Sequence, residues 1–231
     1  MNGEVRSPLR TAARVTGELL ITLGLVVLLF AAYEVWGKVA QLHDHQNTLD
    51  NQLAQDWGGP TVSPSAEPSG PAPSSAPELP PPPGNAIGRL YIPRLNLHWV
   101  VVEGVALSDI RFAPGHYPST AMPGQVGNFS VAGHRSPGIF WDLDRVRPGD
   151  LVIMETRTNW FVYQVFQSHI VTPHSVEVIA ATPNRPGVAP SEADMTLTTC
   201  NPKWNNYQRM AVHAMLIDTT AHDQRPKEFG G

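Results

Sequence analysis

Cysteine is nearly absent from this sequence, which has one, Cys200, among 231 residues. A single cysteine excludes an intrachain disulfide and any zinc or iron–sulfur site that is built from several cysteines. Charged side chains are also few, at 16% of the residues, and the net charge is −4. No basic field therefore points to nucleic acid as a partner.

Metal-ligating side chains do not form a recognisable pattern. His43 and His45 are close in sequence but have no further ligand beside them. The carboxylates of Glu177, Glu192 and Asp194 are scattered along the chain. Because metal sites need several donors at suitable spacings, we expect no metal site, no calcium dependence and no cofactor.

Long apolar runs are confined to the N-terminus. Three arginines precede a run from Leu19 to Tyr33, and only Lys38 follows it closely. With its flanks the run covers residues 18–36, close to the roughly 20 residues that a membrane span needs. The arginines predict a cytoplasmic N-terminus and place the rest of the chain outside. A cleaved signal peptide is the alternative, but no small-x-small cleavage site follows closely, which favours an uncleaved anchor.

Proline is plentiful, with 23 residues, but clustered. Ten of the 27 residues from 58 to 84 are proline, and most of the others are Ser, Ala or Gly. This composition cannot bury a core, so it predicts a disordered, polyproline-like linker. Just before it, residues 37–57 carry apolar side chains at a spacing that indicates a possible helical stalk.

These changes in composition predict the domain organisation. The successive parts are a cytoplasmic N-terminus (1–17), a transmembrane anchor (18–36), a possible helical stalk (37–57), a Pro-rich linker (58–84), a folded domain (85–219) and a polar tail (220–231).

The folded domain consists mainly of short strand patterns separated by turn signals such as Pro-Gly. Several short strands at close spacing favour an all-β barrel or sandwich. Short helical connections are expected over 108–112 and 139–143. The predicted strands are 87–92, 97–102, 128–132, 151–155, 160–166, 170–171, 176–179, 195–199 and 209–217.

The strand that leads to the cysteine shows period-2 alternation. Its apolar residues are expected to face a core and its polar residues a groove. The core set is Met195 and Leu197, and the groove set is Thr196, Thr198 and Cys200.

Proline at position 202 ends this strand, because proline cannot donate to a ladder. If the strand pairs with 209–217 as a hairpin, Cys200 and Arg209 lie opposite each other at the base of the connection 201–208. Directly opposed residues are about 4.5–5.5 Å apart at Cβ. A guanidinium that close favours thiolate over thiol.

Nine histidines are present, so one histidine proves nothing by itself. His116, His134 and His174 lie in loops or at strand ends, where catalytic groups collect. His134 ends a strand and is flanked by Gly133. By pattern alone it is the best of the three.

These features together resemble the sortases. Thr196 to Cys200 matches the Thr-Leu-x-Thr-Cys signature, Arg209 lies where the family has its arginine, and residues 131–135 resemble its histidine segment. The resemblance covers residues 86–218. It implies an eight-stranded sortase-type β-barrel with short helical connections, here preceded by one transmembrane helix.

The resemblance also implies a cysteine transpeptidase. Cys200 would be the nucleophile, His134 the acid and base, and Arg209 the group that stabilises the intermediate or holds the substrate. Sortases cut a Leu-Pro-x-Thr-Gly-like signal between Thr and Gly and join the threonine to an amine of the cell-wall precursor. The implied partners are therefore secreted proteins that bear sorting signals, the peptidoglycan amine and the membrane.

Within the family, the loop sequence between residues 113 and 129 is most like class E of high-GC Gram-positive bacteria, whose members tend to accept Leu-Ala-x-Thr-Gly. Tyr117 is a candidate for contacting the second position of the signal, and Thr198 and Thr199 are further substrate-binding candidates. For Tyr117, packing on the barrel is at least as good an interpretation.

Sortases that polymerise pilins usually carry an Asp-Pro-aromatic lid and often a C-terminal membrane segment. This sequence has no such lid near the folded domain and its tail is polar, so the resemblance implies anchoring in preference to pilin polymerisation. A reading from another class remains open. The domain could be a non-catalytic wall- or peptide-binding β-barrel on a membrane stalk, with Cys200 incidental.

Overall fold

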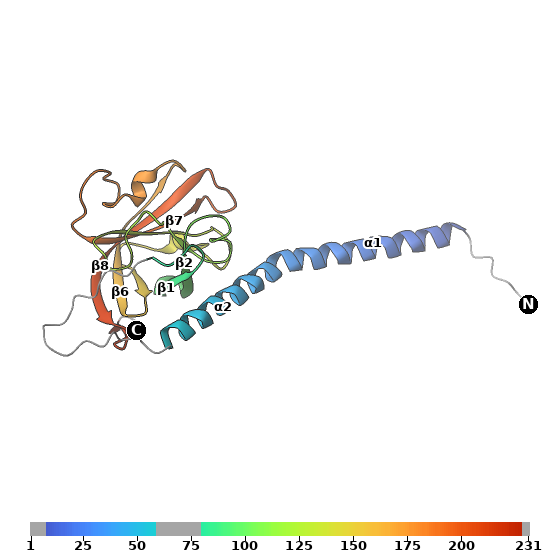
Figure 1. The fold of residues 1–231 in the computed structure, drawn as a ribbon. Coiled ribbons are helices and arrows are strands. Elements are labelled where there is room, and N and C mark those ends of the chain that lie inside the picture. Colours follow the sequence, from blue (N-terminus) through green and yellow to red (C-terminus); the bar gives the residue numbers. More distant parts are fainter. Residues whose placement is uncertain (1–7, 59–79, 228–231) are drawn as a thin grey trace, which may run out of the picture. The chain divides into compact units, whose positions relative to one another are not determined.

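The computed structural model describes residues 8–58 and 80–227, which form two compact units divided after His43 (Figure 1). Most of the predicted linker 58–84 lies outside the described residues, as do the first seven and the last four residues of the chain.

The first unit is helical. It contains α1 (Pro8–Ala32), a short π-helical segment η1 (Tyr33–Gly37) and the beginning of α2 (Lys38–Gly58). Among the described residues, Leu9–Ala32 is the helix that is long and apolar enough to cross a membrane. Its side chains are not covered by other parts of the protein, which fits a membrane anchor.

The second unit contains a closed barrel of eight strands, as predicted. Their order around the barrel is β1-β2-β3-β4-β7-β8-β6-β5. Short 3₁₀ helices η2 (Pro93–Leu95), η3 (Leu143–Arg145) and η4 (Val176–Ile179) connect them. The strands are β1 (Ala86–Ile92), β2 (Leu97–Glu103), β3 (Gly115–His116), β4 (Gly127–Ala132), β5 (Leu151–Glu155), β6 (Asn159–Val171), β7 (Ala193–Asn201) and β8 (Gln208–Ala221).

Two strand predictions and one helix prediction were wrong, and the helix predicted over 139–143 is shifted, with turns over 139–142 and η3 beginning at Leu143. Residues 176–179 form η4 instead of a strand, and only Val178 is buried there, so the apolar alternation does not mark a sheet face. Residues 170–171 are the end of the long β6 and not a separate strand. Residues 108–112 form turns instead of a helix. Strand β3 was missed because two residues are too short for any periodicity to show.

The predicted polar face of β7 does not open onto a groove along its length. Thr196 and Thr198 are both buried, at 0% and 6% exposure. The hydroxyl of Thr196 donates to the Asn128 side chain at 2.8 Å, and the carbonyl of Val178 in η4 lies 3.3 Å away. Alternation therefore identified the polar face but not the segment that covers it, and of this set Cys200 alone is partly exposed.

His213 forms part of the same buried network. Its Nδ1 lies 2.9 Å from the Thr196 hydroxyl, and its Nε2 lies 3.2 Å from the amide nitrogen of Asn184. An amide nitrogen can only donate, so Nε2 accepts and the ring is neutral. Burial, with a smaller effect of His169, lowers the pKa of His213 to about 4.

This neutral ring predicts a loss of stability in mild acid. Below pH 6.5, the ordinary histidine pKa, residue 213 is protonated in the unfolded chain but stays neutral in the folded protein. The free energy of unfolding therefore decreases as the pH is lowered from 6.5 to about 4. The expected loss of unfolding free energy is about 3 kcal/mol. Denaturant unfolding across this range should show a shallower pH dependence in His213→Gln. The exposed control His174→Gln should keep the wild-type slope, and an unchanged slope in His213→Gln would contradict the assignment.

The part of α2 that belongs to the second unit packs on the barrel. Gln46 is buried, and its amide both accepts from the Val100 N–H at 2.7 Å and donates to the Val100 carbonyl at 3.3 Å. The same amide donates to the Phe112 carbonyl at 2.9 Å. Asp50 forms an ion pair with Arg89 in β1. Residues 44–58 are therefore part of the barrel's packing.

This packing predicts that residues 44–58 stabilise the folded domain. Gln46→Ala leaves the buried Val100 N–H without a partner, which should cost about 1–3 kcal/mol in a thermal or denaturant melt. The exposed Gln52→Ala on the same helix should be neutral. A chain that begins at residue 85 should fold but melt at a lower temperature than one that begins at residue 44. Equal melting temperatures would show that the helix contributes nothing.

Candidate active site

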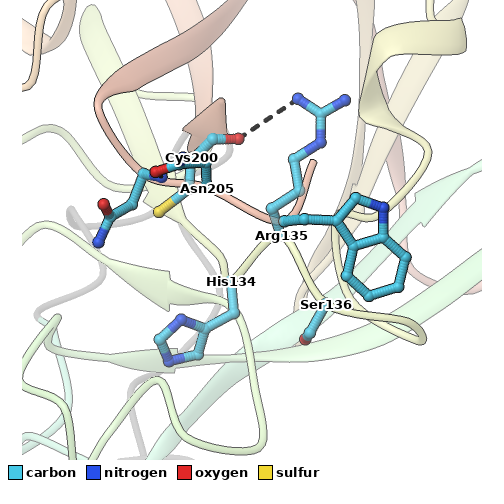
Figure 2. A pocket seen from close by; sticks show the side chains of 7 residues that line it. His134, Arg135, Ser136, Cys200 and Asn205 are labelled. Atoms are coloured by element: carbon cyan, nitrogen blue, oxygen red, sulfur yellow. Dashed lines mark hydrogen bonds between the residues drawn. The ribbon is translucent and has the colours of Figure 1, made fainter. Parts of the chain in front are cut away.

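Two strands that run in the same direction bring a histidine and the cysteine to one rim of the barrel. Strands β4 and β7 pair in parallel, and every pair from Gly127–Ala193 to Ala132–Thr198 has the same offset of 66 residues. His134 and Cys200 each lie two residues beyond the last pair, with the same offset. Figure 2 shows both side chains facing the same pocket.

The turn that carries His134 is fixed by its neighbours. The Gly133 N–H donates to the Thr198 carbonyl at 3.0 Å, and the Thr199 hydroxyl donates to the Gly133 carbonyl at 2.8 Å. A Cβ atom at Gly133 would lie 2.4 Å from the ring of Phe140, which is fully buried. Glycine is therefore needed at this position, because the Phe140 ring packs directly on the backbone before His134.

The predicted hairpin between β7 and β8 is present, and Cys200 pairs directly with Arg209. The connection is 202–207, shorter than expected, since both strands extend further toward the loop. One guanidinium nitrogen of Arg209 donates to the carbonyls of Asn206 and Gln208, at 2.7 and 2.8 Å. In this structure Arg209 therefore holds the loop.

The pocket at the rim is open and has a volume of about 400 Å³. It contains two of the predicted site residues, Cys200 and His134, but its lining does not include Arg209, Tyr117, Thr198 or Thr199. The lining residues are His134, Arg135, Ser136, Cys200, Trp204, Asn205 and Asn206.

The three predicted substrate-binding residues are connected to the site from the side. Tyr117 is partly exposed, and its hydroxyl lies 3.2 Å from that of Thr198. The Thr198 hydroxyl is also 3.4 Å from the Val131 carbonyl. Thr199 is buried, and its hydroxyl is donated to Gly133 as described above.

The other two candidate histidines do not line the pocket. His116 is fully buried, with Nδ1 2.7 Å from a Glu103 carboxylate oxygen and Nε2 3.1 Å from the Ala121 carbonyl. His174 is exposed in the turn before η4. His134 is therefore the one of the three that shares a pocket with the thiol.

Five of the seven residues that line the pocket were not predicted as site residues from the sequence, and Arg135 and Trp204 are the two largest of them. Arg135 directly follows His134, but nothing in the sequence shows that its side chain turns inward. Trp204 has a positive φ of 71° and is largely exposed, so neither burial nor periodicity could have indicated its place. In the part of the chain that the structure describes, no cluster of three or more His, Cys, Asp or Glu residues could hold a metal ion.

A closed eight-stranded barrel with a cysteine and a histidine at one rim is the architecture of cysteine transpeptidases of the sortase type. A family model described as the sortase domain matches residues 90–217, more than half of the chain. The chain belongs to the sortase family, whose members are cysteine transpeptidases.

Two curated relatives come from Streptomyces coelicolor. Sortase SrtE1 is 31% identical over 229 residues, which are 95% of this chain and 60% of the relative. Sortase SrtE2 is 29% identical, and the alignment covers 97% of this chain and 92% of the relative. The resemblance to class E sortases is confirmed, although the chain spans only 60% of the length of SrtE1.

Solved sortases share the barrel. A SrtA sortase from Actinomyces oris superimposes with a TM-score of 0.60 at 33% identity, over 67% of this chain and 93% of that one. Sortase E1 from Streptomyces coelicolor, solved with a tripeptide in its active site, gives a TM-score of 0.59 at 29% identity, over 63% of this chain and 97% of that one.

Proposed function

We propose that this chain is a membrane-anchored transpeptidase that cleaves a Leu-Pro-x-Thr-Gly or Leu-Ala-x-Thr-Gly-like signal between Thr and Gly. It then joins the threonine of the secreted protein to an amine of the cell-wall precursor. The observation that carries the proposal is the shared rim of His134 and Cys200, set by the parallel register of β4 and β7. A tripeptide in the active site of the Streptomyces coelicolor sortase E1 structure supports a peptide substrate.

The proposed reaction has two acyl transfers. The Cys200 thiolate attacks the carbonyl carbon of the signal threonine, and the tetrahedral intermediate collapses to a thioester. The bond to glycine breaks, and its nitrogen leaves as an amine with a proton from the His134 imidazolium. The wall amine then attacks the thioester and gives a proton to His134. A new amide forms, and the Cys200 thiolate is released.

Arg209 is proposed to donate hydrogen bonds to the oxyanion or to the substrate backbone. Its pairing with Cys200 puts both side chains on the same face of the hairpin, with Cβ atoms about 4.5–5.5 Å apart. One terminal nitrogen of the guanidinium donates to the carbonyls of Asn206 and Gln208, so the other nitrogens are the proposed donors to the substrate.

Tyr117, partly exposed and linked to Thr198, is proposed to contact the second position of the signal. Thr198 would act through this link. Thr199 would act on the peptide only indirectly, because its hydroxyl donates to the Gly133 carbonyl and so fixes the backbone before His134.

The proposed topology has the N-terminus in the cytoplasm, α1 in the membrane and the barrel outside. The apolar, uncovered surface of α1 supports a membrane position. The arginines at its N-terminal side support this orientation. We propose wall anchoring as the task, in preference to pilin polymerisation.

The nucleophile assignment predicts that Cys200→Ala abolishes cleavage without unfolding the barrel, because no thioester can form. Full-length protein in detergent should be incubated with a panel of Leu-Pro-x-Thr-Gly and Leu-Ala-x-Thr-Gly peptides and a small amine, and the products identified by mass spectrometry. Wild type should give both the free glycine fragment and the amine adduct. Binding without cleavage by wild type would favour the non-catalytic peptide-binding barrel instead.

The role of Arg209 predicts a difference between two variants. If its planar fork donates directed hydrogen bonds, Arg209→Lys should lose about 10²–10³-fold in kcat/KM although it keeps the charge. If charge alone matters, Arg209→Lys should recover much of the activity that Arg209→Ala loses. Wild-type activity in Arg209→Ala would remove this residue from the site.

A further inference from the structure

Arg135 is a buried cation beside the proposed acid and base. Its side chain is only 3% exposed. One terminal nitrogen donates to the Cys200 carbonyl at 3.3 Å and to the Asn201 side-chain oxygen at 3.0 Å. The other lies 2.9 Å from a carboxylate oxygen of Asp144. Figure 2 shows the guanidinium turned toward the backbone of Cys200, while the His134 ring points into the pocket.

These contacts join three segments that meet only at the rim. The backbone of Arg135 follows directly on His134, and its guanidinium reaches the end of β7 through Cys200 and the start of η3 through Asp144. Burying a guanidinium is costly unless good partners satisfy it. The two terminal nitrogens have such partners, whereas the buried Nε has no hydrogen-bond partner among the described residues. The fold therefore bears part of this cost for the contacts of the two terminal nitrogens.

Asp144 extends the connection to the loop that borders the pocket. Lys203 contacts Asp144 at 3.2 Å and Asp142 at 2.9 Å, and its ammonium lies 5.2 Å from the centre of the Trp141 ring. Trp141 in turn packs edge-to-face on Trp204, with ring centres 4.7 Å apart.

The Asp144 carboxylate carries the negative charge that its contacts with Arg135 and Lys203 require. Burial alone would raise its pKa, but the hydrogen bond from Lys203 and the charges of Arg135 and Lys203 outweigh burial and lower it. The carboxylate is thus ionised at neutral pH and able to hold both cations.

We propose that Arg135 is a positioning residue that fixes the Cys200 backbone relative to His134 and couples this geometry to the 202–207 loop through Asp144 and Lys203. The proposal rests on the transpeptidase function above. Arg135 lines the pocket, but its terminal guanidinium nitrogens are directed at Cys200, Asn201 and Asp144, so we assign it to positioning and not to substrate contact. An ammonium cannot replace it, since a single nitrogen does not span acceptors on opposite sides of a planar fork.

The test compares Arg135→Lys, Arg135→Gln and Asp144→Asn with wild type in the full chain in detergent. Arg94→Gln is the matched control, since it removes an arginine that pairs with Asp150 at 3.9 Å on the surface, away from the pocket lining. Three quantities are measured: the thermal melt, kcat and KM with a cleaved peptide, and the pH profile of iodoacetamide alkylation, which reports Cys200 alone because it is the only cysteine.

We expect both Arg135 variants to lose about 10²-fold in kcat, the effect of a misplaced reacting group, with KM changed less than threefold. The pH profile of alkylation should differ from that of wild type in both variants, so Arg135→Lys should not restore the wild-type profile. Asp144→Asn should shift kcat and the alkylation profile in the same direction as the Arg135 variants, by a smaller factor. Arg94→Gln should change neither kcat nor the alkylation profile. If the Arg135 variants do not fold, the proposal is tested by Asp144→Asn, whose kcat and alkylation profile should still shift.

Three outcomes would overturn the proposal. They are wild-type kcat in a folded Arg135 variant, a change confined to KM, or a lower melting temperature with kcat and the alkylation profile unchanged. Failure of the proposed function is distinguishable, because wild type would then cleave no peptide in the panel. The alkylation profile would still report whether Arg135 controls the environment of Cys200.

Discussion

The parallel ladder between β4 and β7 is the constraint on which the site depends. Parallel strands end at the same edge, so a residue that follows one strand lies beside a residue that follows the other. The constant offset of 66 residues puts His134 level with Cys200, although the chain between them passes through two more strands and two 3₁₀ helices. Of those intervening segments, the stretch with Phe140 and Asp144 contacts the rim directly, through Gly133 and Arg135.

Two kinds of contact maintain that register beyond the last ladder pair. Hydrogen bonds between Gly133 and the Thr198–Thr199 pair continue the connection of β4 to β7 through one backbone bond and one hydroxyl. The Phe140 ring closes over Gly133 from the other side. Arg135 then reaches across to the carbonyl of Cys200. The rim is therefore built by short-range contacts that surround His134, and the barrel provides the frame on which they form.

Sequence analysis predicted the barrel class, most strands and the meeting of Cys200 with Arg209. These follow from alternation, from Pro202 as a strand end and from a motif of fixed spacing. It could not predict that Thr196 would be covered by η4, because covering depends on a segment about twenty residues away in sequence. Nor could it predict the inward turn of Arg135. A charged residue after a strand is normally solvent-exposed, and it is the acceptors provided by Cys200, Asn201 and Asp144 that compensate for its burial.

Closed barrels have no free sheet edge, yet the two-residue β3 covers only the end of β2. At Val100 the N–H and the carbonyl are both taken by one side-chain amide, that of Gln46, which occupies the place of a neighbouring strand residue. An uncovered strand edge is a template on which another chain can add itself. The amide of Gln46 therefore also acts against aggregation, since it occupies the outward N–H and carbonyl of Val100, at which a second molecule could otherwise pair.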